Sequence, residues 1–348
     1  METLMQTGGN ILVIQTAFLG DAILTLPMIQ ELKKKNSESK LDVLAIPSTE
    51  IIFSSSSYVD NVIVIDKREK HKSIKRLNNF IKELREKSYS IIYSPHRSFR
   101  SAYITIKLGV RETYGFDNSS FKYAYKNIVK YKQTDHEVQR NLELIGEDTK
   151  DKSWKISPEI IIAETEKEKV TDVLSTNKID TEFIAVAPGS VWETKRYPKE
   201  YYSEVIKSLI AKNEKVVLIG GENDKLLCDE IAFNTNDKVK NLAGEFSVTE
   251  TIQLLGSAKL LITNDSAPTH MGMCADIPVL TIYCSTAPGF GFYPYNNKSR
   301  YLSYDKLDCK PCGIHGYKEC PVKSFDCGYK LIPEDILKEV EKMLGENE

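Results

Sequence analysis

The chain has 348 residues, with 47 Lys and Arg against 49 Asp and Glu, so its formal net charge is −2. This length favours about two domains, and the near-neutral charge excludes an overall attraction to nucleic acid. Hydrophobic residues make up 41% and charged residues 28%, which excludes a disordered or fibrous chain.

The chain shows no targeting or membrane-spanning pattern. No apolar run approaches the roughly 18 residues of a membrane span. The first ten residues lack the basic and apolar regions of a secretory signal. We therefore expect a cytoplasmic protein.

The first half alternates short β-branched runs with longer amphipathic runs, a pattern typical of parallel strands joined by helices. The predicted strands are Asn10–Gln15, Leu41–Ile46, Val59–Asp66 and Ser90–Ser94. The predicted helices are Ala22–Lys35, Ser73–Lys87, Ser98–Leu108 and His136–Ile145. A less regular, tyrosine-rich stretch precedes the last helix, and the polar segment Gly146–Pro158 is interpreted as a linker.

The same pattern restarts in the second half. The predicted strands are Phe183–Ala187, Val216–Ile219, Leu260–Thr263 and Val279–Tyr283. The predicted helices are Ala163–Thr176, Lys199–Lys212, Asp224–Ala232, Thr249–Leu255, Thr269–Ala275 and Pro333–Leu344. We therefore predict an α/β fold of two tandem Rossmann-like, doubly wound domains, residues 1–165 and 166–348, whose strand ends face a shared cleft.

The turn after the first strand carries a candidate general base. No G-x-G-x-x-G follows this strand and no P-loop motif occurs, which argues against a dinucleotide dehydrogenase or a P-loop NTPase. Instead, Gly20 and Asp21 place a carboxylate at a strand-to-helix turn. Asp21 is interpreted either as a helix cap or as a general base held rigidly at the functional end of the strand.

The segment after Leu260–Thr263 predicts a phosphate site. Asp265, Ser266 and Ala267 followed by Pro268 are typical of a helix N-terminus, whose free N–H groups bind anions. His270 lies on the same first turn and would either donate to a phosphate or pack against the sheet.

Two further turns carry side chains that could bind a diphosphate or a sugar. Ser190, in a Pro-Gly-Ser turn, and Lys195 could complement a leaving diphosphate, although adjacent basic residues such as Lys195 and Arg196 are commonly solvated. Glu222 follows a Gly-Gly turn, where it could bind sugar hydroxyls or simply favour the first turn of the next helix.

Four blocks together carry a resemblance over nearly the whole chain. They are FLGDAILTLP (Phe18–Pro27), APGSVWETKRYP (Ala187–Pro198), LIGGEND (Leu218–Asp224) and TNDSAPTHMGMCADIPVLTIY (Thr263–Tyr283). In these blocks the chain resembles the ADP-heptose:lipopolysaccharide heptosyltransferases, which are inverting glycosyltransferases with the two-domain GT-B fold. The motif Lys-Arg-aromatic-Pro that begins at Lys195 looks more like that of the enzyme that adds the second heptose than that of the enzyme that adds the first.

The resemblance implies a role for each matched position. Asp21 would be the general base in an acceptor-side first domain, and the second domain would bind the nucleotide sugar. The implied donor-binding residues are Ser190, Lys195, Glu222, Asp265, Ser266, Ala267 and His270. No cofactor is implied, and the sequence has no D-x-D pair in a turn that would argue for a metal.

The implied acceptor is an acidic, lipid-linked core oligosaccharide. Arg97 and Arg100, at a predicted strand end, resemble the acceptor-side loop of the family. The stretch Lys67–Lys87 has nine cations against three anions, which is either a solvated helix face or a contact with the anionic inner membrane surface. We therefore expect peripheral membrane contact and no nucleic-acid partner.

A cysteine cluster near the C-terminus stays open to interpretation. Cys309, Cys312, Cys320 and Cys327 could hold a structural zinc ion that staples the loop 309–327, with His315 as a substitute ligand. Zinc ribbons usually show two C-x-x-C pairs, however, and this chain has one. Reduced buried thiols or an opportunistic disulfide are the alternatives.

Two other functions fit the same architecture. A nucleotide-sugar epimerase would need paired acid and base carboxylates and no separate acceptor. A carbohydrate-binding relative without activity would tolerate a decayed site, whereas the matched site residues are all present here. A related transferase could also use a different donor sugar.

Overall fold

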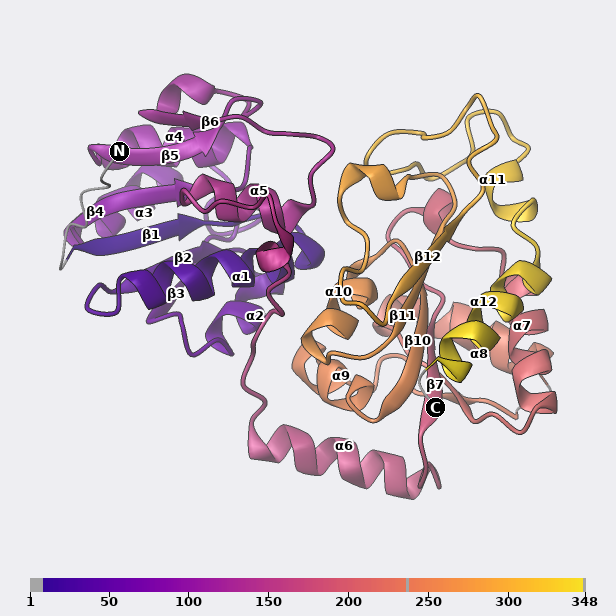
Figure 1. Cartoon of the computed structure of the whole chain (residues 1–348). Helices are drawn as coiled ribbons and strands as arrows, with labels where there is room; N and C mark the ends of the chain where they lie inside the picture. Colours follow the sequence, from indigo (N-terminus) through magenta and orange to yellow (C-terminus); the bar gives the residue numbers. More distant parts are fainter. Residues whose placement is uncertain (1–8, 236–237, 347–348) are drawn as a thin grey trace. The chain divides into compact units, whose positions relative to one another are not determined.

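The chain folds into two compact units. The computed structural model describes residues 9–235 and 238–346, and the chain divides between Ile161 and Ile162. This division lies a few residues before the domain boundary expected at residue 165. Each unit contains one parallel six-stranded sheet with helices on both faces (Figure 1). The predicted two-domain α/β fold of Rossmann-like units is therefore confirmed.

Unit 1, residues 9–161, is built around the first sheet. Its strands are β1 (Asn10–Ile14), β2 (Leu41–Ala45), β3 (Asn61–Val64), β4 (Tyr89–Ser94), β5 (Glu112–Phe116) and β6 (Asn127–Val129). Its helices are α1 (Leu19–Lys35), α2 (Glu50–Ser54), α3 (Ile74–Glu86), α4 (Phe99–Leu108) and α5 (Glu137–Leu144), with 3₁₀ turns η1 (Pro47–Thr49), η2 (Lys122–Ala124) and η3 (Lys152–Trp154). The strand order is β3-β2-β1-β4-β5-β6.

Unit 2, residues 162–346, repeats this architecture. Its strands are β7 (Phe183–Ala187), β8 (Val216–Leu218), β9 (Lys240–Asn241), β10 (Ala258–Asn264), β11 (Val279–Tyr283) and β12 (Arg300–Ser303), in the order β12-β11-β10-β7-β8-β9. Its helices are α6 (Glu164–Thr176), α7 (Lys199–Ala211), α8 (Lys225–Asn234), α9 (Val248–Leu255), α10 (Ala267–Cys274), α11 (Asp326–Tyr329) and α12 (Pro333–Gly345), with 3₁₀ turns η4 (Glu193–Lys195), η5 (Glu222–Asp224) and η6 (Pro288–Phe290). Within the described ranges, no helix is long and apolar enough to cross a membrane.

The central strands are buried on both faces because helices cover each sheet on either side. All five residues of β7 and of β11 are buried, which explains their uninterrupted apolar sequence. Gly272 lets α10 pack closely on this sheet, since a Cβ atom there would lie 2.4 Å from Cγ2 of Val279. This close packing fixes the position of the start of α10 relative to the carboxyl end of β10.

Two parts of unit 1 are more ordered than the sequence predicts. The tyrosine-rich stretch contains β5 and β6, and β5 carries Gly115, against which the ring of Tyr125 packs. The segment 146–158 is not a free linker, because Trp154 in η3 is buried and stacks on His136 at 5.0 Å between ring centroids. Hydrogen bonds from Gln139 to the oxygen of Thr149 and from Gln30 to the oxygen of Ser157 also attach this polar segment to the unit.

Candidate functional site

Both sheets reverse their strand order at the centre. The reversal lies between β1 and β4 in unit 1 and between β7 and β10 in unit 2. Ligands of doubly wound folds bind at this point, outside the carboxyl ends of the strands. Most of the predicted site residues follow these strands: Asp21 after β1, Arg97 and Arg100 after β4, Ser190 and Lys195 after β7, and Asp265, Ser266, Ala267 and His270 after β10.

Asp21 lies in the first turn of α1 and is half-buried. The N-cap residue of this helix is Phe18, and the main-chain N–H groups of Phe18 and Asp21 hydrogen-bond to the Asp21 carboxyl, so Asp21 also helps to cap the helix. Burial and the nearby Glu137 raise the pKa of the Asp21 carboxyl to about 7, against the opposing attraction of Arg97. A carboxyl group that exchanges its proton near neutral pH is suited to general base catalysis.

Three cations gather near the loop that follows β1. The ammonium of Lys67 donates to the main-chain oxygen of Thr16 at 2.6 Å. Burial and repulsion from Arg100 lower the pKa of Lys67 to about 8. Nη1 of Arg100 is buried, and no described residue hydrogen-bonds with it. In the described part of unit 1, no carboxylate forms an ion pair with Lys67, Arg97 or Arg100, so the cluster fits an anionic ligand.

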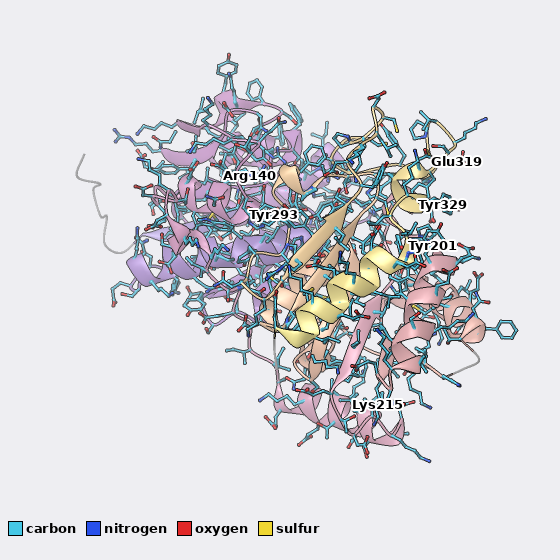
Figure 2. The ribbon with its side chains drawn as sticks, turned by 45° about the vertical axis from the view of Figure 1, so that its right-hand side comes forward. Arg140, Tyr201, Lys215, Tyr293, Glu319 and Tyr329 are labelled. Carbon is cyan, nitrogen blue, oxygen red and sulfur yellow. The ribbon has the colours of Figure 1, made fainter. Side chains whose placement is uncertain are left out.

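Arg97 is held by an aromatic ring that α5 fixes in place. Its guanidinium lies 4.1 Å from the ring centroid of Tyr131, and that of Arg140, labelled in Figure 2, lies 4.4 Å from it. The Tyr131 hydroxyl donates to Oε2 of Glu137 at 3.1 Å, and Nε of Arg140 pairs with the same oxygen at 3.1 Å. The carboxylate that raises the pKa of Asp21 therefore also supports Arg97.

In unit 2, Lys195 and Asp265 form a largely buried ion pair. Nζ of Lys195 lies 2.7 Å from Oδ2 of Asp265 and donates to the main-chain oxygen of the same residue at 3.1 Å. The Asp265 carboxylate also accepts a hydrogen bond from Oγ1 of Thr286 at 2.7 Å. An ammonium has three N–H donors, so one donor of Lys195 is left for a ligand.

The first turn of α10 adds donors next to this pair. His270 is buried there, and burial, reinforced by the charge of Lys195, lowers its pKa to about 4 against the effect of Asp265. The imidazole is therefore neutral at physiological pH, and its Nδ1 lacks a hydrogen-bond partner in the described structure. Among the described residues, no acceptor binds the N–H groups of Ser266 and Ala267 either. Such groups at a helix N-terminus can bind a diphosphate.

Asn264, the last residue of β10, ties the surrounding loops together. Its amide nitrogen donates to the oxygen of Pro188 at 2.7 Å, and its amide oxygen accepts from the N–H of Tyr197 at 2.9 Å. Asp224 packs under the turn after β7, where a Cβ atom on Gly189 would lie 2.1 Å from Oδ1 of Asp224. The turn that precedes Ser190 is therefore fixed from two sides.

Ser190 and Glu222 occupy different environments. Ser190 is buried, and its Oγ atom accepts a long hydrogen bond of 3.4 Å from the N–H of Trp192, which leaves the hydroxyl proton free to donate. Glu222 is exposed and follows β8, one strand further from the centre of the sheet. Glu222 belongs to the same 3₁₀ turn, η5, as Asp224, which packs against Gly189 next to Ser190.

The cysteines of the loop 309–327 lie near one another. Burial raises the pKa of the Cys327 thiol against the effect of Lys310, and Cys312, Cys320 and Cys309 add to the rise. All four are free thiols, with Cys309 exposed and Cys327 buried against the core of unit 2. Within the ranges described, no three His, Cys, Asp or Glu side chains are arranged so that they could hold a metal ion. A structural zinc ion at these cysteines therefore stays a prediction from the sequence, and such a site would need four ligands at about 2.0–2.3 Å from the metal.

Sequence reasoning missed three residues of the site. Lys67 was grouped with an exposed basic stretch, although its position just after β3 marks it as a strand-end residue. Asn264 lies inside a quoted motif, and its place at the very end of a buried strand was the available signal. Glu137 had no distinguishing signal, because an acidic residue in the first turn of a helix is ordinary.

Comparison with known proteins identifies the family. Residues 77–322 match the family described as Glycosyltransferase family 9 (heptosyltransferase). The chain belongs to glycosyltransferase family 9. This family 9 glycosyltransferase is 25% identical to lipopolysaccharide heptosyltransferase 2 of Salmonella typhimurium, in an alignment that covers 97% of the chain and 99% of the relative.

Solved structures support the same fold. A glycosyl transferase family 9 protein from Veillonella parvula superposes with a TM-score of 0.81 at 23% identity and covers 98% of both chains. The ADP-heptose lps heptosyltransferase II of E. coli gives a TM-score of 0.76 at 22% identity, over 97% of this chain and 99% of that one. The two-domain fold of the family 9 glycosyltransferase is therefore that of these proteins.

Replacing Lys195 tests the anion site of unit 2. We expect Lys195→Ala to weaken the binding of ADP roughly tenfold or more, because a hydrogen bond to a charged group contributes about 1.5–3 kcal/mol. Isothermal titration calorimetry measures this change. Lys199→Ala is the matched control, since Lys199 forms an exposed ion pair with Glu230 in the same unit. An unchanged ADP affinity of Lys195→Ala would remove Lys195 from the site.

Proposed function

We propose that this family 9 glycosyltransferase transfers a heptose from ADP-L-glycero-D-manno-heptose to the inner core of lipopolysaccharide, with inversion at the anomeric carbon. Two features together carry the proposal. Unit 1 has a carboxyl group with a pKa of about 7, and unit 2 has hydrogen-bond donors around Lys195 that could bind a diphosphate. The family and the full-length match to a relative named lipopolysaccharide heptosyltransferase 2 support the choice of sugar and acceptor.

In the proposed reaction, Asp21 takes the proton from the acceptor hydroxyl as its oxygen attacks the anomeric carbon. The bond between that carbon and the phosphate oxygen of ADP breaks in the same step. Lys195, His270 and the N–H groups at the start of α10 stabilise the charge on the leaving ADP. Because the displacement is in line, the anomeric configuration inverts. We expect no cofactor, since these donors complement the leaving diphosphate.

The cations of unit 1 support an acidic acceptor. Lys67, Arg97 and Arg100 have no carboxylate partners within the described residues, so carboxylates or phosphates of a core oligosaccharide would compensate their charge. The block Lys195 to Pro198 favours an acceptor that already carries one heptose, as in the transfer of the second heptose.

A product assay tests this function. We expect nucleotide release from ADP-heptose only when a lipid-linked acceptor is present, and mass spectrometry should detect a product heavier by one heptose. A mono-heptosylated acceptor should react faster than a heptose-free one. Conversion of the sugar without an acceptor would instead favour an epimerase, and donor binding without turnover would favour a carbohydrate-binding protein without activity.

Replacing Asp21 tests the general base. We expect Asp21→Asn to lower kcat by roughly 10²–10⁴-fold while ADP affinity stays close to native, because general base catalysis contributes a factor of this size. The native kcat/KM should fall as the pH drops below about 7, since the protonated Asp21 carboxyl cannot accept a proton. Glu31→Gln, on the same helix, serves as the control. Near-normal turnover of Asp21→Asn, measured by ADP release, would contradict the role.

We also propose that the enzyme works at the cytoplasmic face of the inner membrane, in peripheral contact with anionic lipid. Lys72, Lys75 and Lys82 are exposed at the start of α3 and along it, where they can face a negatively charged surface. Basic residues near such a surface contribute about 1 kcal/mol each, and the effect decays within a Debye length.

Charge reversal tests this contact. The triple variant Lys72→Glu, Lys75→Glu and Lys82→Glu should bind vesicles with anionic lipid at least roughly tenfold more weakly in sedimentation assays, and added salt should remove the difference. Reversing Lys199, Lys212 and Lys215 in unit 2 changes the net charge equally and provides the control. Equal vesicle binding by the two triple variants would contradict a membrane contact through α3.

A further inference from the structure

The loop 309–327 is anchored at both ends to the sheet of unit 2. At its start, Nζ of Lys310 donates to the main-chain oxygen of Tyr283 at 2.9 Å, at the end of β11. At its end, Cys327 is buried in the core. Tyr329 packs edge-on against Tyr201 of α7, with ring centroids 5.9 Å apart (Figure 2). The loop therefore returns to the body of the unit and its middle has a limited range of positions.

The middle of the loop is hydrogen-bonded to the residue that precedes Lys195. The N–H of Thr194 donates to the oxygen of Tyr317 at 3.1 Å, and the N–H of Tyr317 donates to Oγ1 of Thr194 at 2.8 Å. Ser285, after β11, donates from Oγ to Oγ1 of Thr194 at 3.0 Å and from its N–H to the oxygen of Thr194 at 3.2 Å. Thr194 is buried, so these bonds join three loops around one residue.

Gly316, in the middle of this loop, lies next to Lys195. It is buried and has a φ angle of +77°, in the left-handed region. A Cβ atom at this position would lie 3.0 Å from Oγ1 of Thr194, 3.0 Å from Oγ of Ser285 and 3.3 Å from Cγ of Lys195. The main chain of Gly316 therefore sits against the aliphatic stem of Lys195, and a side chain there would displace the lysine or its neighbours.

We propose that Gly316 and Tyr317 are positioning residues of the donor site, which hold Lys195 for the diphosphate group of a nucleotide sugar. The inference rests on the proposed function, in which Lys195 binds the donor. It gives a role to the loop 309–327, which takes no part in the roles proposed above for the general base, the ion pair and the acceptor-binding cations.

Positioning matters here because a lysine side chain is flexible. Holding it in one rotamer costs conformational entropy, and a site that fixes the rotamer before binding avoids this cost when the donor arrives. Asp265 holds the ammonium end of Lys195, and Gly316 limits the space around its stem. The two contacts together define the direction of the remaining N–H donor.

Two glycines of the same loop provide a matched experiment. Gly313 also has a positive φ, of +97°, but a Cβ atom there would meet nothing within 4 Å. Both Gly316→Ala and Gly313→Ala therefore carry backbone strain, and only the first crowds Lys195. In the full-length enzyme, we expect Gly316→Ala to raise the Kd of ADP and the KM of the donor roughly tenfold. We expect kcat to fall as well, because Lys195 also stabilises the leaving ADP, while the acceptor KM stays nearly unchanged. Gly313→Ala should retain native donor affinity.

Thr194 variants supply a second measurement in case Gly316→Ala does not fold. Thr194→Val loses the hydroxyl that accepts from Tyr317 and should weaken ADP binding, whereas Thr194→Ser keeps the hydroxyl and should restore it. Equal ADP affinity for Gly316→Ala and Gly313→Ala, or for Thr194→Val and Thr194→Ser, would overturn the proposal. If Lys195→Ala itself leaves ADP affinity unchanged, the donor site fails as well. If Lys195→Ala binds ADP more weakly while Gly316→Ala binds it with native affinity, only the role of the loop is contradicted.

Discussion

In each sheet, the strand order reverses at the centre, and this reversal determines where polar side chains can gather. Helices that follow the two central strands cross to opposite faces of the sheet, so the loops after those strands diverge and leave their polar groups accessible. In unit 1 this arrangement presents Asp21 and Arg97, and in unit 2 it presents Lys195 and the start of α10. The same topology thus presents a carboxyl group in one unit and hydrogen-bond donors suited to an anion in the other.

The two units treat buried charge differently. In unit 2 the charge of Lys195 is balanced by Asp265, which holds the ammonium in place without a ligand. In unit 1 the cations have no carboxylate partner in the described part of the chain, and the pKa of Lys67 falls to about 8 as a result of burial and repulsion. Unpaired cations of this kind are costly in a folded protein, so an anionic ligand would stabilise the unit as it binds.

Much of the fold could be predicted from the sequence because its signals are local. The central strands read as buried apolar runs, and Pro268 marked the start of α10. The edge strands β6, β9 and β12 were missed, since they are short and half-exposed and owe their order to pairing with a neighbouring strand. The polar segment around Trp154 was taken for a linker for a related reason, because its attachment depends on a stacking partner that is distant in the chain.

The family, the two-unit α/β architecture and the strand-end positions of Asp21, Lys195 and His270 could be predicted from the sequence, because these depend on short motifs and on periodicity. Only the tertiary structure decided which groups meet across distant segments. It paired Lys195 with Asp265, placed Glu137 and Arg97 around Asp21, brought Lys67 to Thr16, and packed Gly316 against Lys195. The pKa values and the positions of the charges follow from those contacts, since burial and neighbouring charge act through space and leave no pattern in the local sequence.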